Sequence, residues 1–413
     1  MLQPNSAIRI PQFATPPRFF FLLDIDCFFA SVEMALNPAL RNVPLCVGGL
    51  KEDRGIVSCP NYEARKYGVR TAMPLRTAAR MLPPEAVFVR GHYKLYGEYS
   101  DRVMAILNDF TPDVEQVSVD EAYMDVTGCL HFWGHDPQRM AAAMQERIMK
   151  ECGLSVSIGG ASNRACAKIA AGVRKPAGLV IVPPGTEREF LSPLPVEAVP
   201  GIGVKTAPVL HACGIRTVGE AMARAEQREN GGGERVSALC RRIASCAVPS
   251  DEPIVAHDHV EKSISRDRTF GEDTSSSEYV RGTLYYLTER VCKTLRRDGL
   301  QASTVTVKVR FTDFTTLQKQ GPLPVPSSNE EDLFAVALRL LARLLPTASR
   351  IRLVGVKASG LTPADEQLNL GVVPTEKIDM LHHRLDALQT RFGYTSIRWG
   401  ITCGVAERRE ERE

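Results

Sequence analysis

Residues 19–30 read FFFLLDIDCFFA, and this stretch decides how the rest of the chain is interpreted. Five apolar residues lead into Asp24-Ile25-Asp26, and further apolar residues follow. The pattern predicts a β-strand that is buried on both faces and ends in carboxylates. A charge at the end of a buried strand is costly because the carboxylate loses its hydration. The strand therefore needs a partner that offsets its negative charge.

Residues 117–126, VSVDEAYMDV, supply a second pair of acids in an apolar setting. Neighbouring side chains of a strand point to opposite faces, so Asp120 and Glu121 serve one centre only if the chain turns there. One interpretation is a surface hairpin with a solvated Asp-Glu tip. The other is that both acidic stretches bind divalent cations together. Mg²⁺ prefers carboxylate oxygens and phosphates, and two metal ions about 3.5–4 Å apart promote phosphoryl transfer.

Length and composition are typical of a multi-domain enzyme of the cytoplasm. A chain of 413 residues with 44% hydrophobic content is expected to form two to four domains. It has no apolar run near the roughly 18 residues that cross a bilayer, and its first residues lack the apolar core of a signal peptide. The 11 cysteines form no CxxC pair, which favours reduced thiols over a disulfide framework or a zinc site.

The positive charge of the chain is unevenly distributed. Residues 262–361 carry 16 Lys+Arg against 10 Asp+Glu, a net of +6, whereas residues 362–413 have a net of −2. A basic module followed by an acidic tail indicates contact with a polyanion through the module. Ordinary solvated charge is the alternative, and the charge excess alone does not decide between them.

Strands and helices are expected to alternate around the acids. The hydrophobic pattern predicts helices over residues 139–152 and 166–173 and strands over 155–162 and 178–182. This alternation favours an α/β fold in which helices cover one face of a sheet. Breaks in the chain are expected at Pro83-Pro84, at Pro183-Pro184-Gly185, in the Gly-rich residues 226–235 and in residues 249–261.

Basic side chains are placed where they could hold phosphates. In PNYEARKYGVR (60–70), Tyr62, Arg65 and Lys66 share one face of a predicted helix. A phenol and cations on one face suit a triphosphate, and Lys175 in VRKPAG is a further candidate. Each could instead be a solvated cation, which is the favoured interpretation for Lys66.

Residues 197–219, EAVPGIGVKTAPVLHACGIRTVG, carry a glycine-rich turn before a helix. Gly201 and Gly203 permit a close backbone approach, and the N–H groups of the helix that follows can hold an anion. This frame predicts a helix-hairpin-helix that grips the backbone of a nucleic acid without reading its bases. An ordinary pair of helices joined by a turn is the alternative.

Taken together, these stretches resemble the Y-family DNA polymerases, the translesion class that includes bacterial DNA polymerase IV. The resemblance spans roughly residues 18–400, with the motifs in the order of the family. The motifs that carry it are FLLDIDCFFASVE (21–33), NYEARKYGVR (61–70), VSVDEAYMDVT (117–127), AKIAAGVRKPAG (167–178), VPGIGVKTA (199–207) and KSISRDRTF (262–270).

The resemblance implies a right-hand polymerase, a multi-domain α/β protein with an α+β palm. The implied divisions are a flexible N-terminal extension (1–17), palm (18–27 and 85–182), fingers (28–84), helix-hairpin-helix thumb (183–250), linker (251–261), little finger (262–361) and a clamp-binding tail with a C-terminal helix (362–413). The little finger coincides with the basic segment. The extension and the tail have no implied catalytic role.

For the active site, the resemblance implies two Mg²⁺ ions held by acids of the palm. Asp24 and Asp120 would bridge both ions, Glu121 would hold the ion at the primer 3′-hydroxyl, and the Ile25 carbonyl would complete the nucleotide-side ion. Asp26 is left out of this set.

The resemblance also assigns the nucleotide pocket. Phe29 matches the steric gate that excludes a 2′-hydroxyl, although a core aromatic is the alternative. Tyr62, Arg65 and Lys175 match the triphosphate-binding positions, and Ser58 would lie in the roof over the nascent base pair. Cys59-Pro60 departs from the small or hydroxylated residues expected there, and Pro60 lacks an N–H.

Contacts to DNA and to a sliding clamp are implied further along the chain. Gly201 and Gly203 would hold one part of the duplex. Arg266 and Arg268, two apart on a predicted strand, would face one side and contact template phosphates. The peptide EQLNL (366–370) resembles a clamp-binding motif, with Gln367, Leu368 and Leu370 as its contacts. Gly371 stands where an aromatic residue is usual, and the leucines could instead pack on the little finger.

The expected function is template-directed DNA synthesis of the translesion type, with low fidelity and a role in damage tolerance. The expected partners are primer–template DNA, deoxynucleoside triphosphates and the sliding clamp, for a monomeric protein of the bacterial cytoplasm associated with the nucleoid. An inactive polymerase-like accessory protein is one alternative, but the complete acid set argues against it. A nucleotidyl cyclase is the other, and the helix-hairpin-helix and basic module argue against that.

Overall fold

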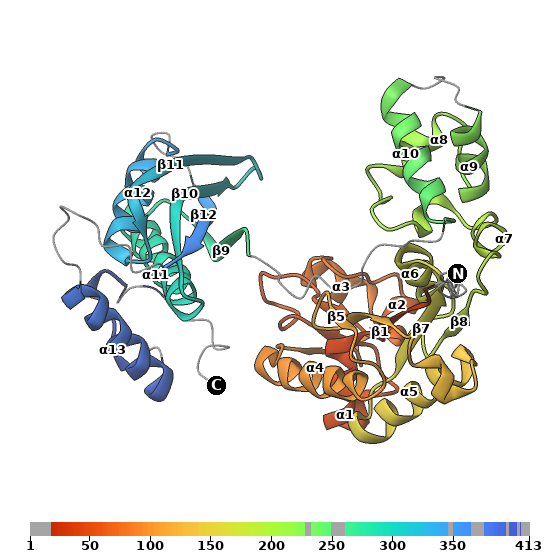
Figure 1. Ribbon diagram of the computed structural model, residues 1–413. Coiled ribbons are helices and arrows are strands. Elements are labelled where there is room, and N and C mark those ends of the chain that lie inside the picture. The colour runs from red at the N-terminus through yellow and green to blue at the C-terminus, as the bar shows by residue number, and fades with distance from the viewer. Residues whose placement is uncertain are drawn as a thin grey trace, which may run out of the picture. The chain divides into compact units, whose positions relative to one another are not determined.

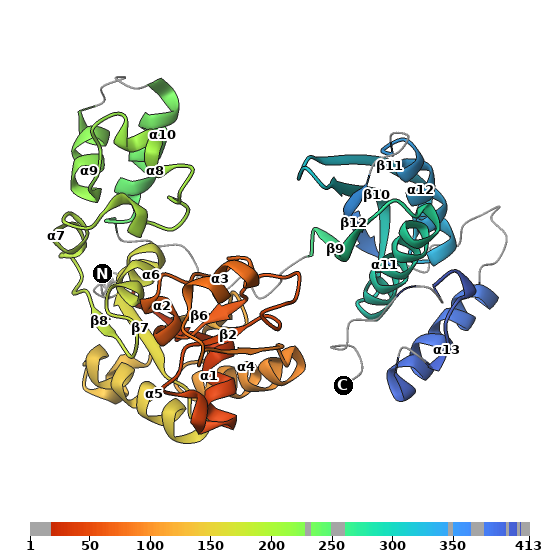
Figure 2. The same cartoon turned by 180° about the vertical axis from the view of Figure 1, so that it is seen from behind.

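The structure is a computed structural model that describes residues 18–227, 233–248, 261–345, 350–364, 376–393, 396–402 and 405. Contacts divide the chain into two units, Met1–His257 and Asp258–Glu413 (Figures 1 and 2). The boundary falls inside the segment that the sequence indicates as a linker. The two units are described separately below.

A five-stranded sheet forms the centre of the first unit. Its strand order is β5 (Val114–Gln116), β6 (Glu121–Asp125), β1 (Phe20–Ile25), β7 (Val156–Ala161) and β8 (Leu179–Ile181). The pair β7–β8 is parallel and the other pairs are antiparallel. The predicted strands around residues 19–26, 155–162 and 178–182 are confirmed as β1, β7 and β8.

Helices cover both faces of this sheet, so the prediction of helices on one face is wrong. Phe21, Leu23 and Ile25 pack in a core with α1 (Phe28–Leu36), α4 (Tyr93–Asn108) and α5 (Pro137–Cys152). Phe20 and Leu22 point the other way, into a core with α6 (Arg164–Val173). The reason is that β1 carries apolar side chains on both of its faces, and both faces must therefore be buried by helices.

The contact between α6 and the sheet depends on a glycine. A Cβ atom at Gly159 on β7 would collide with the backbone of α6 at Ala167 and Ala171. Glycine therefore allows the helix to lie directly on the strand. The side chain of Asn163 caps this helix by accepting a hydrogen bond of 2.8 Å from the N–H of Cys166.

A three-stranded sheet follows α1 in the chain. Its order is β3 (Cys59–Pro60), β2 (Leu45–Val47) and β4 (Val87–Val89), with α2 (Tyr62–Lys66) and α3 (Leu75–Met81) beside it and η1 (Pro38–Leu40) before it. The buried Asn61 joins these elements. Its side chain accepts hydrogen bonds from the N–H groups of Ala64 (2.9 Å) and Leu45 (3.0 Å) and donates one to the Val43 carbonyl (2.9 Å).

Short helices complete the first unit after β8. They are α7 (Glu187–Leu191), η3 (Val196–Ala198), α8 (Ala207–His211), α9 (Val218–Glu226) and α10 (Gly233–Ser245), and η2 (Leu130–Trp133) lies earlier, after β6. The apolar side chains of the helices after β8 share one core with Phe20 and Leu22 of the sheet. Thr217 and Glu220 form a reciprocal capping box at the start of α9.

The second unit is a four-stranded antiparallel sheet covered by helices on one side. The order is β11 (Thr316–Ser327), β10 (Leu300–Phe311), β12 (Ile351–Pro363) and β9 (Ser263–Thr274). Helices α11 (Ser277–Arg297) and α12 (Glu330–Ala342) pack on the sheet, and α13 (Glu376–Phe392) and η5 (Gly400–Thr402) lie against these helices. The predicted helix near residues 376–392 is confirmed as α13. Among the described residues, no helix is long and apolar enough to span a membrane.

Candidate active site

Two acidic stretches meet at the centre of the first sheet. Strand β6 pairs antiparallel with β1, and Glu121 lies opposite Asp24 in the register. The Ile25 N–H donates to the Asp120 carbonyl at 2.8 Å. Residues 117–120 form the turn between β5 and β6, so the stretch is a hairpin, as one interpretation expects. The hairpin also brings its acids to Asp24, because opposite residues of antiparallel strands share a face.

Lysines pair with two of these three acids. The Lys175 ammonium pairs with the Asp24 carboxylate, and the Lys168 ammonium on α6 donates to Glu121 at 2.5 Å. Burial raises the pKa of Asp24 above its ordinary value, Lys175 opposes the rise, and the neighbouring charges of Asp120 and Glu121 add to it. The negative charge of the acids is therefore only partly offset by the two lysines.

The donor groups of these acids suit divalent cations. All three acids offer carboxylate oxygens, the ligands that Mg²⁺ prefers, and the acids raise the pKa of Asp24 by their proximity. In this structure the lysines hold Asp24 and Glu121, and the ligand atoms of the three acids do not all lie within 4.8 Å of one another among the described residues. A cation would supply the positive charge that the lysines supply here.

A cavity of about 530 Å³ opens beside these residues. Asp24, Lys168 and Lys175 line it on the side of the sheet, and residues 197–203 line it from the helical part of the unit. The cavity between the sheet and residues 197–203 leaves space beside Asp24 for a substrate.

Asp26 has a structural task that the sequence does not reveal. Its side chain is 1% exposed and lies in the turn after β1. It accepts hydrogen bonds from Ser155 Oγ (2.8 Å), Ser157 Oγ (2.8 Å), the Ala177 N–H (2.7 Å) and the Tyr62 hydroxyl (3.3 Å). Asp26 thereby ties α2 to the sheet and to the segment that carries Lys175.

Phe29 lies at the edge of a cluster of aromatic rings. It is half-buried, stacks on Tyr96 with a centroid separation of 4.6 Å, and meets Tyr93 edge-on at 5.6 Å. The Tyr93 hydroxyl lies 3.1 Å from Ser58 Oγ. Phe28, in contrast, is 2% exposed and belongs to the core. Tyr93 thus contacts both Phe29, the candidate steric gate, and Ser58, the candidate roof residue. The sequence analysis did not identify Tyr93.

Tyr62 and Arg65 interact on α2, whereas Lys66 does not join them. The Arg65 guanidinium lies 4.8 Å from the centroid of the Tyr62 ring, and its Nε donates to the Pro60 carbonyl at 3.1 Å. Lys66 is exposed and pairs with Glu63 at 2.8 Å, as expected of a solvated cation. Pro60, the unusual residue before Asn61, therefore orients Arg65 through its carbonyl.

The glycine-rich loop of residues 199–206 presents an exposed backbone. Gly201 has φ +84°, and a Cβ atom there would collide with the guanidinium of Arg242 on α10. That guanidinium donates to the Pro200 carbonyl at 2.8 Å. Gly203 is exposed with open space around it, and Val204 is 91% exposed. The loop can approach another molecule closely.

Arg266 and Arg268 share one side of β9, but this is the side that α11 covers. Arg268 is 9% exposed, and its guanidinium lies 5.5 Å from the centroid of the Tyr286 ring. Arg266 is exposed and lies 3.5 Å from Thr294 Oγ1 of α11. The prediction that both arginines are presented to phosphates therefore needs correction, because Arg268 is packed under a helix.

The opposite side of this sheet carries cations that the sequence analysis missed. Thr306 of β10 pairs with Lys357 of β12, and Lys308 and Arg310 follow at alternate positions of β10. The intervening Val305, Val307 and Val309 are buried toward the helices, so the cations face away from them. Lys308 pairs with Asp267. The alternation of valine and cation along β10 was the signal in the sequence.

The predicted clamp contacts Gln367, Leu368 and Leu370 lie outside the described residues. The same is true of the N-terminal extension and of the linker up to residue 260.

Three segments of the chain match models of one protein family. Residues 23–172 match the model of the impB/mucB/samB family, residues 261–370 match the C-terminal domain of that family, and residues 184–215 match the IMS family HHH motif. The matched segments contain the paired acids, the sheet of the second unit and the start of the glycine-rich helical part.

The chain is similar to one named relative and to two solved structures. The chain is 39% identical over 381 residues to DNA polymerase IV of Dehalococcoides mccartyi (strain CBDB1), covering 92% of this chain and 96% of the relative. A Y-family DNA polymerase chimera matches with a TM-score of 0.72 and 28% identity, covering 84% of this chain and 99% of the chimera. An insertion ternary complex of Dbh DNA polymerase matches with a TM-score of 0.55 and 28% identity, covering 83% and 98%.

The fold and the acids thus define a right-hand polymerase of the Y-family, with palm, fingers, helix-hairpin-helix thumb and little finger. The chain belongs to the impB/mucB/samB family and is a translesion DNA-directed DNA polymerase. The cyclase alternative is excluded by this membership.

Proposed function

We propose that the chain adds deoxynucleotides to a primer 3′-hydroxyl with low fidelity, by a two-metal mechanism that tolerates damaged templates. The single observation that carries the proposal is the pairing of Asp24 with Glu121, beside Asp120 at the hairpin turn. These carboxylates and the Ile25 carbonyl would hold two Mg²⁺ ions. Bound Mg²⁺ would supply the charge that stabilises the attacking and leaving oxygens.

The residues around the acids would bind the incoming nucleotide. Lys175 would leave Asp24 for the triphosphate, because the phosphate oxygens offer it an equivalent negative partner. Arg65, oriented by the Pro60 carbonyl, and Tyr62 would contact the same phosphates. Lys168, on α6, would stay with its partner Glu121 and make no contact with the nucleotide.

Phe29 would select the sugar, and Ser58 would lie over the nascent pair. The Phe29 ring is held from below by Tyr96, so it cannot easily yield to a 2′-hydroxyl. Tyr93 links this ring to Ser58 by an edge contact and a polar contact. A fixed floor and a roof joined to it would define the shape of the pocket.

Primer–template DNA would be held through its backbone by both units. The exposed loop around Gly201 and Gly203 would approach phosphates through its N–H groups. In the second unit, Arg310 and Lys357 would supply cations on the open side of the sheet. The exposed Arg266 would supply a further cation from the other side of the edge strand β9.

We assign the palm, fingers, thumb, linker, little finger and tail with the boundaries given under Sequence analysis.

A sliding clamp would tether the enzyme to the primer end. Leu368 and Leu370 would fill apolar pockets, and Gln367 would hydrogen-bond at the rim. The tether would raise the effective concentration of a monomeric enzyme at its substrate.

Primer extension on undamaged and lesion-bearing templates tests the proposal. The full chain should extend a primer on both with Mg²⁺, and Asp120→Ala should abolish addition while DNA affinity stays close to that of the wild type, since affinity comes from backbone contacts elsewhere. Clamp-dependent processivity should fall when Leu368 and Leu370 are changed to Ala, without loss of distributive extension. Near-normal extension by Asp120→Ala would refute the metal assignment, and arrest at every lesion would refute damage tolerance.

A further inference from the structure

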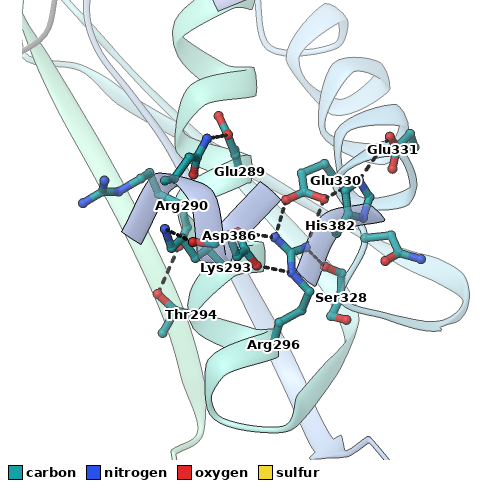
Figure 3. A network of polar contacts seen from close by, with 12 residues as sticks. Glu289, Arg290, Lys293, Thr294, Arg296, Ser328, Glu330, Glu331, His382 and Asp386 are labelled. Atoms are coloured by element: carbon teal, nitrogen blue, oxygen red, sulfur yellow. Dashed lines mark hydrogen bonds and ion pairs between the residues drawn. The ribbon is translucent and has the colours of Figure 1, made fainter. Parts of the chain in front are cut away.

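Helix α13 is attached to the second unit through polar side chains. It lies beside α11 and the first turn of α12, and Arg296 of α11 connects Glu330 of α12 with Asp386 of α13 (Figure 3). The match to the family's C-terminal domain ends at residue 370, so α13 lies beyond it.

The guanidinium of Arg296 is fully used. It is 4% exposed, and its donors reach both Glu330 oxygens (2.7 and 3.0 Å), both Asp386 oxygens (2.7 and 3.1 Å) and the Ser328 carbonyl (3.0 Å). One guanidinium offsets only one of these two carboxylates. Glu331 adds a third negative charge at the edge, so Arg296 leaves a net charge of about −2 on this group of four side chains.

His382 of α13 projects into this group. Its side chain is 2% exposed, and within the described part of the chain neither ring nitrogen makes a hydrogen bond of acceptable geometry. Its Nε2 atom lies 3.2 Å from Glu330 and 3.6 Å from Glu331. One donor atom from each of the three residues lies within 4.8 Å of the others. A buried imidazole that lies beside two carboxylates without a well-aligned hydrogen bond is costly, and a cation shared by the three side chains would satisfy all of them.

These separations match the edges of a metal coordination sphere. Zinc bonds of about 2.0–2.1 Å in a tetrahedron place neighbouring ligand atoms roughly 3.3–3.4 Å apart. An imidazole nitrogen and two carboxylates are a suitable donor set, and Zn²⁺ offsets a charge of −2. Arg296 would orient Glu330 from behind, as supporting residues commonly do at such sites. The Glu331 side chain is 54% exposed, which leaves a way in from solvent and a position for water.

We propose that Glu330, Glu331 and His382 bind one Zn²⁺ ion, and that this ion fixes α13 to α12. The site joins two helices from different parts of the sequence, so its closure docks the C-terminal helix. It has no part in nucleotide addition. The proposal stands whether or not the polymerase mechanism is correct.

Metal binding by the full chain tests the proposal. Metal-stripped protein is titrated with Zn²⁺ by calorimetry and dialysis in excess Mg²⁺, which competes for carboxylates elsewhere in the chain. The wild type should bind one equivalent, and α13 should gain protection from hydrogen exchange. Co²⁺ should give the visible absorption of a tetrahedral site. Both His382→Gln and Glu331→Gln should weaken binding by more than the roughly 10–100-fold that loss of a supporting residue costs.

The neighbouring His383 provides the matched control. It is exposed and lies outside the group, so His383→Gln should bind Zn²⁺ as the wild type does. Glu331→Gln guards against misfolding, because it alters a half-exposed side chain and leaves the buried Arg296 pairs intact. Equal Zn²⁺ binding by wild type and both site variants would overturn the proposal. So would protection of α13 that depends on acid and not on Zn²⁺, since His382 would then be held as an imidazolium.

Discussion

Asp24 on β1 lies directly opposite Glu121 on β6, and the two carboxylates pair with Lys175, just after α6, and with Lys168 on α6. The two acids come from distant stretches of the chain, yet strand pairing alone brings them together. The sheet thus positions the charges, and the lysines offset two of them.

Changing Arg65 to Ala should weaken nucleotide binding. A hydrogen bond to a charged group contributes about 1.5–3 kcal/mol, so KM for the nucleotide should rise by on the order of 10-fold or more with a smaller change in kcat. Steady-state extension by a single nucleotide measures both constants. Lys66→Ala is the control, because Lys66 is exposed on the same helix and pairs with Glu63. An equal effect of both variants would contradict the role of Arg65.

Changing Phe29 to Ala should admit ribonucleotides. Removing the ring opens space for a 2′-hydroxyl, and the preference for deoxynucleotides should fall by at least about 10-fold, the scale of a single steric discrimination. The ratio of kcat/KM values for the two sugars measures it. Tyr93→Phe keeps the ring beside Phe29 and removes only the hydroxyl near Ser58, so its ratio should stay unchanged. If Phe29→Ala leaves the ratio unaltered, the residue is only packing.

The central strands were predictable from local signals. β1 has an uninterrupted apolar run that ends in acids, and β7 and α6 follow clear periodicities. The hairpin at Asp120 was one of two interpretations, and the register of β6 on β1 decided its meaning. A register depends on pairing between distant segments, so the sequence of either strand alone could not establish it.

The remaining features depend on tertiary packing. Alternation along β9 correctly predicted that Arg266 and Arg268 lie on one side of the strand. It did not predict that this is the side that the helices cover. Ile264 and Phe270 have the same parity and are buried, so the sequence held a signal that was missed. α13 runs against the usual rule, because His382 and Gln389 face inward while Leu381 and Leu388 are exposed. Its polar docking needs partners on α11 and α12 that no local pattern indicates.

Neutralising Arg310 and Lys357 together should weaken DNA binding to all sequences about equally. Both lie on the side of the sheet away from the helices. Each lost phosphate contact should reduce the slope of log affinity against log salt by about 1, so the double change to Gln should reduce it by about 2. Titration of a labelled duplex at several salt concentrations measures the slope. Arg339→Gln, at an exposed position of α12, should leave it unchanged.

Asp24 should titrate at a higher pH than an ordinary aspartate in the metal-free protein. Burial raises its pKa more than Lys175 lowers it. Because Lys175 favours the ionised form, Lys175→Met should raise the pKa of Asp24 further, and Lys168→Met should have a much smaller effect. Carboxyl carbon NMR of Asp24 against pH measures this. A lower pKa in Lys175→Met would show that the pairing with Asp24 is absent in solution.

Single-turnover nucleotide addition against Mg²⁺ concentration tests the central claim most directly. The enzymes compared are the wild type, Asp24→Asn, Glu121→Gln and Asp113→Asn, the last an exposed acid just before β5. The amide variants keep the shape of each side chain but lose the negative charge that binds the cation. The account predicts that Asp24→Asn and Glu121→Gln lose at least about 1,000-fold in rate, a barrier increase of roughly 4 kcal/mol, without rescue at high Mg²⁺, while Asp113→Asn matches the wild type. Wild-type rates in either site variant would contradict the assignment of these carboxylates as the metal centre.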